Sequence, residues 1–315
     1  MNILFAGHAG YGGAVLRELL DDASFNVVGV IHASHVKSYN LKRMIRRRFG
    51  TWRRLKLNIR KILSNVPKLG QATYVHSHGF ELVDPYVVAK ERGIPLYDVS
   101  IMQSADFLEQ ITSKSVDVFL VATFGELIPM TIIQTARVAA INIHPGMLPL
   151  HRGGFPELSA MLAGDHIAGI TYHTMTERFD DGDILARYAV EIGESDTLQI
   201  KQKLIALTAS TVVPVLKSVE SLMATRMQQK SSESTKCRYP AGYNVVSYNS
   251  TLHSIKRKVR AAAGENYEVI LEIDGTRIAL LELSDFEGKG LPVKVADGTL
   301  WMKAIRRGRK IFEYQ

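Results

Sequence analysis

Cysteine is almost absent from this chain, with Cys237 alone among 315 residues. A single cysteine excludes an internal disulfide bond and a zinc site built from several thiolates, and it agrees with a reducing compartment. No apolar run approaches the roughly 18 to 20 residues of a membrane-spanning helix, and the start MNILFAG lacks the basic region and cleavage site of a signal peptide. We therefore expect a cytoplasmic protein without an integral membrane segment.

Acidic residues are missing from one long stretch. Between Lys37 and Lys68 the sequence has twelve lysines and arginines and no aspartate or glutamate, which exceeds the net charge of +8 of the whole chain. A solvated helical face is one interpretation, but so one-sided a run repels itself unless an anion neutralises it. The stretch therefore indicates contact with phosphate, nucleic acid or lipid headgroups.

Composition and patterning predict two domains. With 46% hydrophobic and 22% charged residues, the chain is globular and long enough for one large and one small domain. The polar segment 230–235 is the strongest boundary signal. We predict a first domain over 1–228 with a basic helical insertion at 37–69, a linker over 229–238, and a C-terminal domain over 239–315.

The first domain alternates between short apolar runs and amphipathic segments. Strands are expected at 2–6, 27–31, 72–76, 93–97, 116–122, 138–143, 168–175 and up to 190, and helices after residue 13 and at 41–63, 85–92, 105–112, after 129, at 155–163 and at 197–223. This alternation predicts an α/β fold of the Rossmann-like type with a mostly parallel sheet.

The last eighty residues follow another pattern. A basic helix at 252–263 precedes short strands at 267–273, 276–283, 291–296 and 299–305, with Asp-Gly and Lys-Gly turns between them. Short strands at such spacing predict a small C-terminal β-barrel of the OB-like type.

A glycine-rich turn over residues 7–13 follows the first strand and precedes a helix. Free amides at a helix N-terminus bind anions, so Gly10 and Tyr11 are candidate substrate contacts. The glycine spacing is irregular, however, and His32 stands where an NAD enzyme would carry an acidic ribose ligand. A nicotinamide cofactor is therefore disfavoured.

Asn142 and His144 lie at the end of a predicted strand, immediately before a proline and a glycine. Residues two apart on a strand point to the same face, so an amide and an imidazole would look into one cleft. Open α/β sheets bind ligands at such strand ends. A buried network that satisfies loop backbone groups remains the alternative on this pattern alone.

An acidic loop over residues 177–185 has three aspartates around one glycine, Asp180, Asp181 and Asp183. The spacing does not match a calcium-binding loop. One catalytic carboxylate with the other two as turn residues is therefore favoured, and no metal is expected.

These motifs occur in one order: Asn142-Ile143-His144-Pro145, Leu148-Pro149, Arg152-Gly153, Pro156, and then Asp180-Asp181-Gly182-Asp183-Ile184. Together they resemble the folate-dependent formyltransferase family, which has the pattern N-I-H-P-S-L-L-P-x-x-R-G and a later D-x-G-D-I-L. Gly146 and Met147 replace the usual Ser-Leu pair. The resemblance covers residues 1 to about 225, and the C-terminal region resembles the family's tRNA-acting and sugar-acting branches less specifically.

The resemblance implies a reaction and a catalytic triad. The formyl donor would be 10-formyl-tetrahydrofolate, and the acceptor a primary amine. Asn142 would stabilise the oxyanion that forms when the amine attacks the formyl carbon, an effect of about 3 to 4 kcal/mol in analogous sites. His144 would take the amine's proton, and Asp180 would orient His144.

The resemblance also implies binding residues. The folate would contact Phe124, Gly125, Leu127 and Ile128 in the loop over 124–129, together with Asp180. Arg152 and Gly153 are candidate contacts of the acceptor.

The acceptor remains open between two classes. A small-molecule amine, above all a nucleotide-linked amino sugar with phosphate groups, fits the Gly169-Ile170-Thr171-Tyr172-His173 segment and a start unlike that of the tRNA branch. Initiator methionyl-tRNA fits the C-terminal domain and the basic patches. A non-catalytic nucleic-acid or membrane-surface binder is a remote third reading, and a homodimer stays open.

Overall fold

The computed structural model describes residues 1–33, 75–77, 80–237, 242–262, 268–284, 288–307 and 310–313. The basic insertion predicted at 37–69 lies outside these residues. The chain divides into two compact units. The first comprises Met1–Ile143, Thr174–Arg178 and Thr208–Thr225, and the second comprises His144–His173, Phe179–Leu207 and Arg226–Gln315.

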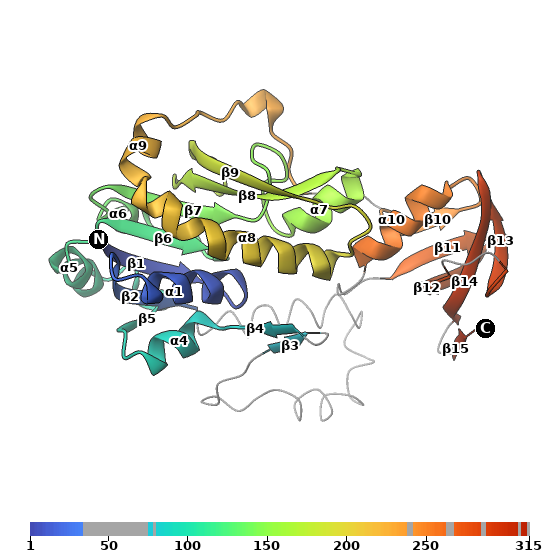
Figure 1. The fold of residues 1–315 in the computed structure, drawn as a ribbon, viewed down its shortest axis with the longest axis horizontal. Helices are drawn as coiled ribbons and strands as arrows, with labels where there is room; N and C mark the ends of the chain where they lie inside the picture. Colours follow the sequence, from blue (N-terminus) through green and yellow to red (C-terminus); the bar gives the residue numbers. More distant parts are fainter. Residues whose placement is uncertain are drawn as a thin grey trace. The chain divides into compact units, whose positions relative to one another are not determined.

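A parallel sheet forms the centre of the first unit, in the strand order β5-β2-β1-β6-β7 (Figure 1). Its strands are β1 (Asn2–Gly7), β2 (Asn26–His32), β5 (Leu96–Asp98), β6 (Val118–Ala122) and β7 (Ala139–His144), the last residue of which belongs to the second unit. All four neighbouring pairs are parallel. The prediction of a mostly parallel α/β sheet is therefore confirmed.

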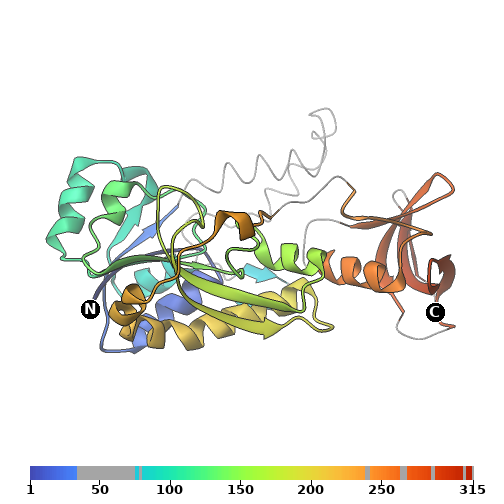
Figure 2. The same cartoon turned by 90° about the horizontal axis from the view of Figure 1, so that it is seen from above.

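Helices cover both faces of these strands. Helices α5 (Ala105–Ser113) and α6 (Met130–Ile133) lie on one side, and α1 (Tyr11–Asp21) lies on the other (Figure 2). Helix α4 (Pro85–Glu91) begins at Asp84, whose carboxylate accepts a hydrogen bond from the amide of Tyr86, and its proline stands in the first turn. The unit also contains the hairpin of β3 (Val75–Ser77) and β4 (Phe80–Leu82), and helix α9 (Val219–Ala224).

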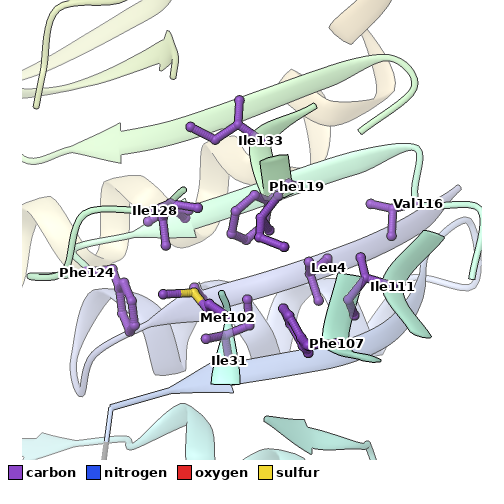
Figure 3. Packing of buried hydrophobic residues seen from close by; sticks show 13 residues of the cluster. Leu4, Ile31, Met102, Phe107, Ile111, Val116, Phe119, Phe124, Ile128 and Ile133 are labelled. Atoms are coloured by element: carbon purple, nitrogen blue, oxygen red, sulfur yellow. The ribbon is translucent and has the colours of Figure 1, made fainter. Parts of the chain in front are cut away.

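A core of buried apolar side chains fills the space between the sheet and α5 and α6 (Figure 3). Phe119 of β6 is fully buried, and Phe107 and Ile111 of α5 pack in the same cluster. Phe124 and Ile128 lie at one end of this cluster in Figure 3. The core therefore anchors the loop that follows β6, because two of the loop's side chains belong to it.

The second unit carries the continuation of the chain after His144. Helix α7 (Pro156–Ala163) is followed by the antiparallel pair β8 (Ile167–Thr174) and β9 (Ile184–Glu191). Helix α8 (Thr197–Lys217) comes next, and its first half belongs to this unit. Among the described residues, no helix combines the length and the hydropathy that a bilayer crossing requires.

The C-terminal strands form a curled, open sheet, and the predicted closed OB-like barrel is not confirmed. The strands are β10 (Val245–Ser247), β11 (Val269–Ile273), β12 (Thr276–Leu283), β13 (Leu291–Val295), β14 (Gly298–Arg307) and β15 (Lys310–Glu313). Their order is β10-β11-β12-β14-β13, with β15 on β14, so the described strands leave two ends unjoined. Helix α10 (Leu252–Ala262) packs its buried Ile255 on this sheet.

The structure differs from the sequence prediction in one helix and in two short strands. The single helix predicted over 197–223 ends at Lys217, and a separate helix, α9, starts at Val219. Ser218 between them has φ of −104° and ψ of 11°, outside helical geometry. Strands β10 and β15 were not predicted, since each has only three or four residues. The boundaries predicted at 228 and 238 stay predictions.

Replacing Phe107 by alanine is expected to lower the free energy of unfolding by about 3 to 5 kcal/mol, because the ring is 1% exposed and the vacated space cannot collapse fully. Phe179→Ala is the matched control, since that ring is 55% exposed and its removal should cost no more than about 0.5 kcal/mol. Urea unfolding followed by fluorescence measures both. Equal losses would contradict the core assignment.

Candidate active site

The second unit holds a buried pair of ionisable side chains. His144, the last residue of β7, is 4% exposed, and Asp180, in the loop before β9, is 8% exposed. The Nδ1 atom of His144 lies 3.4 Å from Oδ1 of Asp180. A buried carboxylate is costly unless polar groups surround it, and His144 is one of the groups that contact Asp180.

A second histidine faces the same carboxylate. His173 of β8 is 2% exposed, and its Nε2 lies 3.7 Å from Oδ1 of Asp180. The backbone amide of Gly153 donates a hydrogen bond of 2.8 Å to the other carboxylate oxygen. Asp180 is thus contacted on both oxygens, and its backbone is held at φ 55°, a left-handed conformation that aspartate tolerates better than most residues.

These contacts set the charge states of the pair. Burial raises the pKa of Asp180, but His173, the charges of both histidines and the Gly153 amide outweigh burial and hold that pKa at about 2. Burial lowers the pKa of His144, and the Asp180 charge opposes this only in part. At neutral pH the site therefore contains a carboxylate beside a neutral imidazole.

The other ring nitrogen of His144 has a defined partner. Its Nε2 lies 2.9 Å from the backbone carbonyl oxygen of His151. Because a carbonyl only accepts hydrogen bonds, Nε2 carries the hydrogen, and neutral His144 keeps Nδ1 unprotonated. The side chain of His151 contacts Ser159 at 2.9 Å and Asp165 at 2.7 Å, which fixes the loop that supplies this carbonyl.

Arg152 and Gly153 follow on the same loop. The guanidinium of Arg152 pairs with Asp181 through Nη1 at 2.5 Å and donates to the side-chain oxygen of Gln229 through Nη2 at 2.7 Å. Asp183 pairs with Arg226 at 3.0 Å. Asp181 and Asp183, expected as turn residues, therefore also form ion pairs that tie their loop to other segments. The acceptor contacts of Arg152 and Gly153 remain predictions.

Asn142 stands two residues before His144 on β7, within the first unit, and is half-buried. The strand pairs it with Val121 of β6. That Asn142 and His144 act together in one site stays a prediction from their spacing on one strand.

The predicted folate loop also belongs to the first unit. The side chains of Phe124 and Ile128 are only 8% and 5% exposed, so they anchor the loop, whereas Gly125 is exposed and Leu127 is 54% exposed. His8 stacks on Phe124 with ring centroids 5.3 Å apart. Its Nε2 accepts a hydrogen bond from the Gly125 amide at 3.4 Å. The folate contacts of Phe124, Gly125, Leu127 and Ile128 remain predictions.

The glycine turn after β1 is closely packed. The Gly10 amide donates to the Val83 carbonyl at 3.0 Å, and the Tyr11 side chain is 8% exposed. A Cβ on Gly13 would lie 2.1 Å from that carbonyl oxygen, so glycine is required there for packing. Substrate contacts of Gly10 and Tyr11 remain predictions.

No group of three or more histidine, cysteine, aspartate or glutamate side chains among the described residues has a metal-binding arrangement.

Sequence reasoning missed several residues of this site. His173 is an isolated histidine in an apolar strand, and its alternation with Thr171 was the one available signal. Gln229 gave no signal, because it reaches Asp180 across 49 residues of sequence. The same holds for Thr235, whose hydroxyl accepts a hydrogen bond from the His151 amide at 2.9 Å.

Comparison with known proteins identifies the family of this chain. The family described as formyl transferase matches residues 53–216, just over half of the chain. The chain therefore belongs to the formyl transferase family. It is 29% identical over 200 residues to the methionyl-tRNA formyltransferase of Ehrlichia canis (strain Jake), a match that covers 63% of this chain and 64% of that protein.

Solved structures share the fold over the whole chain. The structure described as WlaRD, a sugar 3N-formyl transferase in the presence of dTDP and 5-N-formyl-THF, has a TM-score of 0.60 at 14% identity and covers 100% of this chain and 97% of its own. An N-formyltransferase from Helicobacter canadensis, in complex with folinic acid and dTDP-3-aminofucose, has a TM-score of 0.58 at 13% identity and covers 99% of both chains.

We expect Asp180 to remain ionised down to about pH 2, well below an ordinary aspartate. A folded pKa below the unfolded value stabilises the protein above the unfolded pKa near 3.8, and this contribution is lost as pH falls toward 2. Carboxyl-carbon NMR titration of Asp180 tests this. His173→Gln should raise the titration midpoint, whereas a midpoint near 4 in the unsubstituted protein would contradict the assigned contacts.

Proposed function

We propose that this protein transfers a formyl group from 10-formyl-tetrahydrofolate to the primary amine of a nucleotide-linked amino sugar. The observation that carries the reaction is the buried His144–Asp180 pair, with Nδ1 and Oδ1 3.4 Å apart, at the end of the strand that also bears Asn142. An imidazole beside an ionised carboxylate and an amide on the same strand face are the groups that acyl transfer to an amine requires.

The folate supplies the formyl group, and the loop after β6 fits it chemically. Leu127 presents an exposed apolar side chain, and the exposed Gly125 has open space around its Cα, where an added Cβ would meet only His8 Nε2 at 3.6 Å. A flat heterocycle needs an apolar wall with a few backbone polar groups, which such a loop offers. The two solved neighbours hold formylated folates according to their descriptions, which supports the same donor here.

His144 accepts the proton that the attacking amine loses. Its neutral form has the hydrogen on Nε2, bound to the His151 carbonyl, and Nδ1 is the basic atom. Proton uptake gives an imidazolium in which each N–H has an acceptor, namely the His151 carbonyl and the Asp180 carboxylate. Asp180 therefore stabilises the protonated state, while burial keeps the pKa of His144 low enough to release the proton to the departing folate nitrogen.

Asn142 acts on the oxygen of the formyl group. Its amide donates a hydrogen bond to this oxygen, which becomes negatively charged as the amine attacks. A donor fixed on a strand is already oriented when the charge develops, so it lowers the barrier without reorganisation.

The amino-sugar acceptor is supported by the basic helix α10. Among its four cations, Lys258 donates to the Val245 carbonyl at 3.0 Å, and Arg260 pairs with Glu194. Arg257 lies against Gly164 at the end of α7, where an added Cβ would collide with its guanidinium. Two of the four charges thus have partners within the unit and a third lies against the end of α7, while Lys256 is exposed. This weakens the case for a phosphate-backbone surface on this helix.

Initiator methionyl-tRNA is the second candidate acceptor. It is favoured by the Ehrlichia canis relative, a methionyl-tRNA formyltransferase at 29% identity. The sugar N-formyltransferase structures, in contrast, cover nearly the whole chain, including the C-terminal sheet.

A competition assay distinguishes the acceptors. Purified protein with 10-formyl-tetrahydrofolate is offered charged initiator tRNA, a panel of nucleotide-linked amino sugars, and the matching hydroxyl sugars as controls. We expect kcat/KM for one amino sugar to exceed that for tRNA at least about tenfold, with no transfer to hydroxyl sugars. His144→Ala should lower kcat about 10²- to 10⁴-fold and Asn142→Ala about 10²- to 10³-fold. A higher kcat/KM for tRNA would contradict the proposed amino-sugar acceptor. Variants with an unchanged kcat would contradict the proposed mechanism.

Gly146 leaves room for the His144 ring. A Cβ at residue 146 would lie 2.7 Å from Nε2 of His144 and 2.8 Å from Cβ of Pro156. The serine usual at this position in the family would therefore push the imidazole away from the His151 carbonyl in this chain. Glycine at 146 is consequently part of how this protein positions its base.

Gly146→Ala should accordingly lower kcat about tenfold or more, because a displacement near 1 Å at a reacting group is costly. Gly154→Ala is the matched control in the same loop, since an added Cβ there meets nothing within 4 Å. Steady-state kinetics, with the acceptor identified by the competition assay, measures kcat of both variants. If the Gly146→Ala enzyme is as active as the Gly154→Ala enzyme, the position of the His144 ring does not require a glycine at residue 146.

A further inference from the structure

The segment that joins α9 to the C-terminal strands contacts both loops of the candidate active site. Met227 forms two backbone hydrogen bonds with Ile184, of 2.8 and 2.9 Å, beside the Asp180 loop. Farther along, the Thr235 carbonyl accepts from the Arg152 amide at 2.9 Å, and the Cys237 amide donates to the Arg152 carbonyl at 2.8 Å. Residues 227–237, which overlap the linker predicted over 229–238, are thus hydrogen-bonded to the loops of the site near both ends.

Gln229 is the residue of this segment with the most direct contact to the acidic loop. Its Nε2 donates to the backbone carbonyls of Asp180 at 3.1 Å and Gly182 at 2.6 Å. Its Oε1 accepts from Arg152 Nη2 at 2.7 Å, while Nη1 of the same guanidinium pairs with Asp181. Every hydrogen-bonding capacity of the amide nitrogen is used, and an amide is the one uncharged side-chain group that can donate twice and accept at once.

Asp180 needs such support. Its φ of 55° lies in the left-handed region, which is unfavourable for residues other than glycine. Such a conformation persists only where surrounding contacts impose it. Its carboxylate must also stay between His144, His173 and the Gly153 amide, with the His151 side chain on the neighbouring loop. The two hydrogen bonds from Gln229 to the carbonyls of residues 180 and 182 hold the backbone of this turn, in addition to the contacts of the Asp180 carboxylate.

We propose that Gln229 is a positioning residue for catalysis, which holds the Asp180 carboxylate against His144 by clamping the 180–182 backbone and Arg152 together. Gln229 touches neither reacting group and acts through Asp180. The proposal rests on the formyl-transfer function given above, but its structural part does not depend on the acceptor.

The adjacent glutamine provides a matched control. Gln228 has the same side chain, is exposed, and stands one position earlier in the same segment. Gln229→Leu and Gln228→Leu therefore remove the same group from positions inside and outside the clamp. Gln229→Glu keeps the size but replaces both donors with an acceptor that faces two carbonyls.

The first measurement is amide hydrogen exchange of Gly153 by NMR in the full chain, without donor or acceptor. The Gly153 amide is bound to the Asp180 carboxylate itself, so its exchange reports whether that carboxylate is in place. We expect Gln229→Leu and Gln229→Glu to speed this exchange about tenfold and Gln228→Leu to leave it unchanged. Unchanged exchange in the Gln229 variants overturns the proposal, whatever the acceptor proves to be.

The second measurement is a double-mutant cycle in kcat. We expect Gln229→Leu to lower kcat about tenfold in the otherwise unsubstituted enzyme and less than about twofold in an Asp180→Asn background, because a residue that acts through Asp180 has no further effect once that carboxylate is gone. Equal losses in both backgrounds indicate a general structural role and overturn the proposal. If no amine is formylated, the proposed function fails, while the exchange measurement still decides the clamp.

Discussion

The contact of one buried carboxylate with its neighbours is the constraint on which the site depends. Asp180 would be costly to ionise in its 8% exposed position, and a neutral acid there could not stabilise an imidazolium. His144, His173 and the Gly153 amide keep the pKa of this carboxyl at about 2. One of these partners comes from strand β7, one from strand β8 and one from the loop after residue 150. Three separate segments of the second unit therefore meet at the negative charge of Asp180.

Two departures from the family pattern fit together in this chain. Gly146 provides space for the His144 ring, as a Cβ there would lie 2.7 Å from Nε2. Met147 occupies the space beside Gly169 of β8, where a Cβ would lie 2.2 Å from its sulfur. Met147 at this position therefore requires the small residue Gly169 on β8. In a close-packed interior, substitutions at neighbouring positions depend on one another in this way.

The C-terminal region is bound to the rest of the second unit by specific contacts. Thr197 at the start of α8 donates to the Ala261 carbonyl of α10 at 2.8 Å, and two of the four cations of α10, Lys258 and Arg260, have partners within the unit. A basic helix in a sequence suggests an anionic partner, but the same charges serve equally well to bind helix ends and carbonyls. Which of these uses a basic helix serves depends on side-chain partners that composition does not reveal.

The linear sequence determined the parallel α/β fold and the strand that bears Asn142 and His144, because period-two alternation and strand–helix rhythm are local properties. The choice of Asp180 among three aspartates came from the resemblance to the family's motif. The sequence also indicated the loop after β6, but not that Phe124 and Ile128 are anchors while Leu127 is exposed. Tertiary structure alone decided that His173 shares the carboxylate, that the C-terminal strands form an open sheet, and that residues 227–237 clamp the site. Each of these depends on hydrogen bonds or packing between residues far apart in the chain, such as Gln229 and Asp180, which no local pattern encodes.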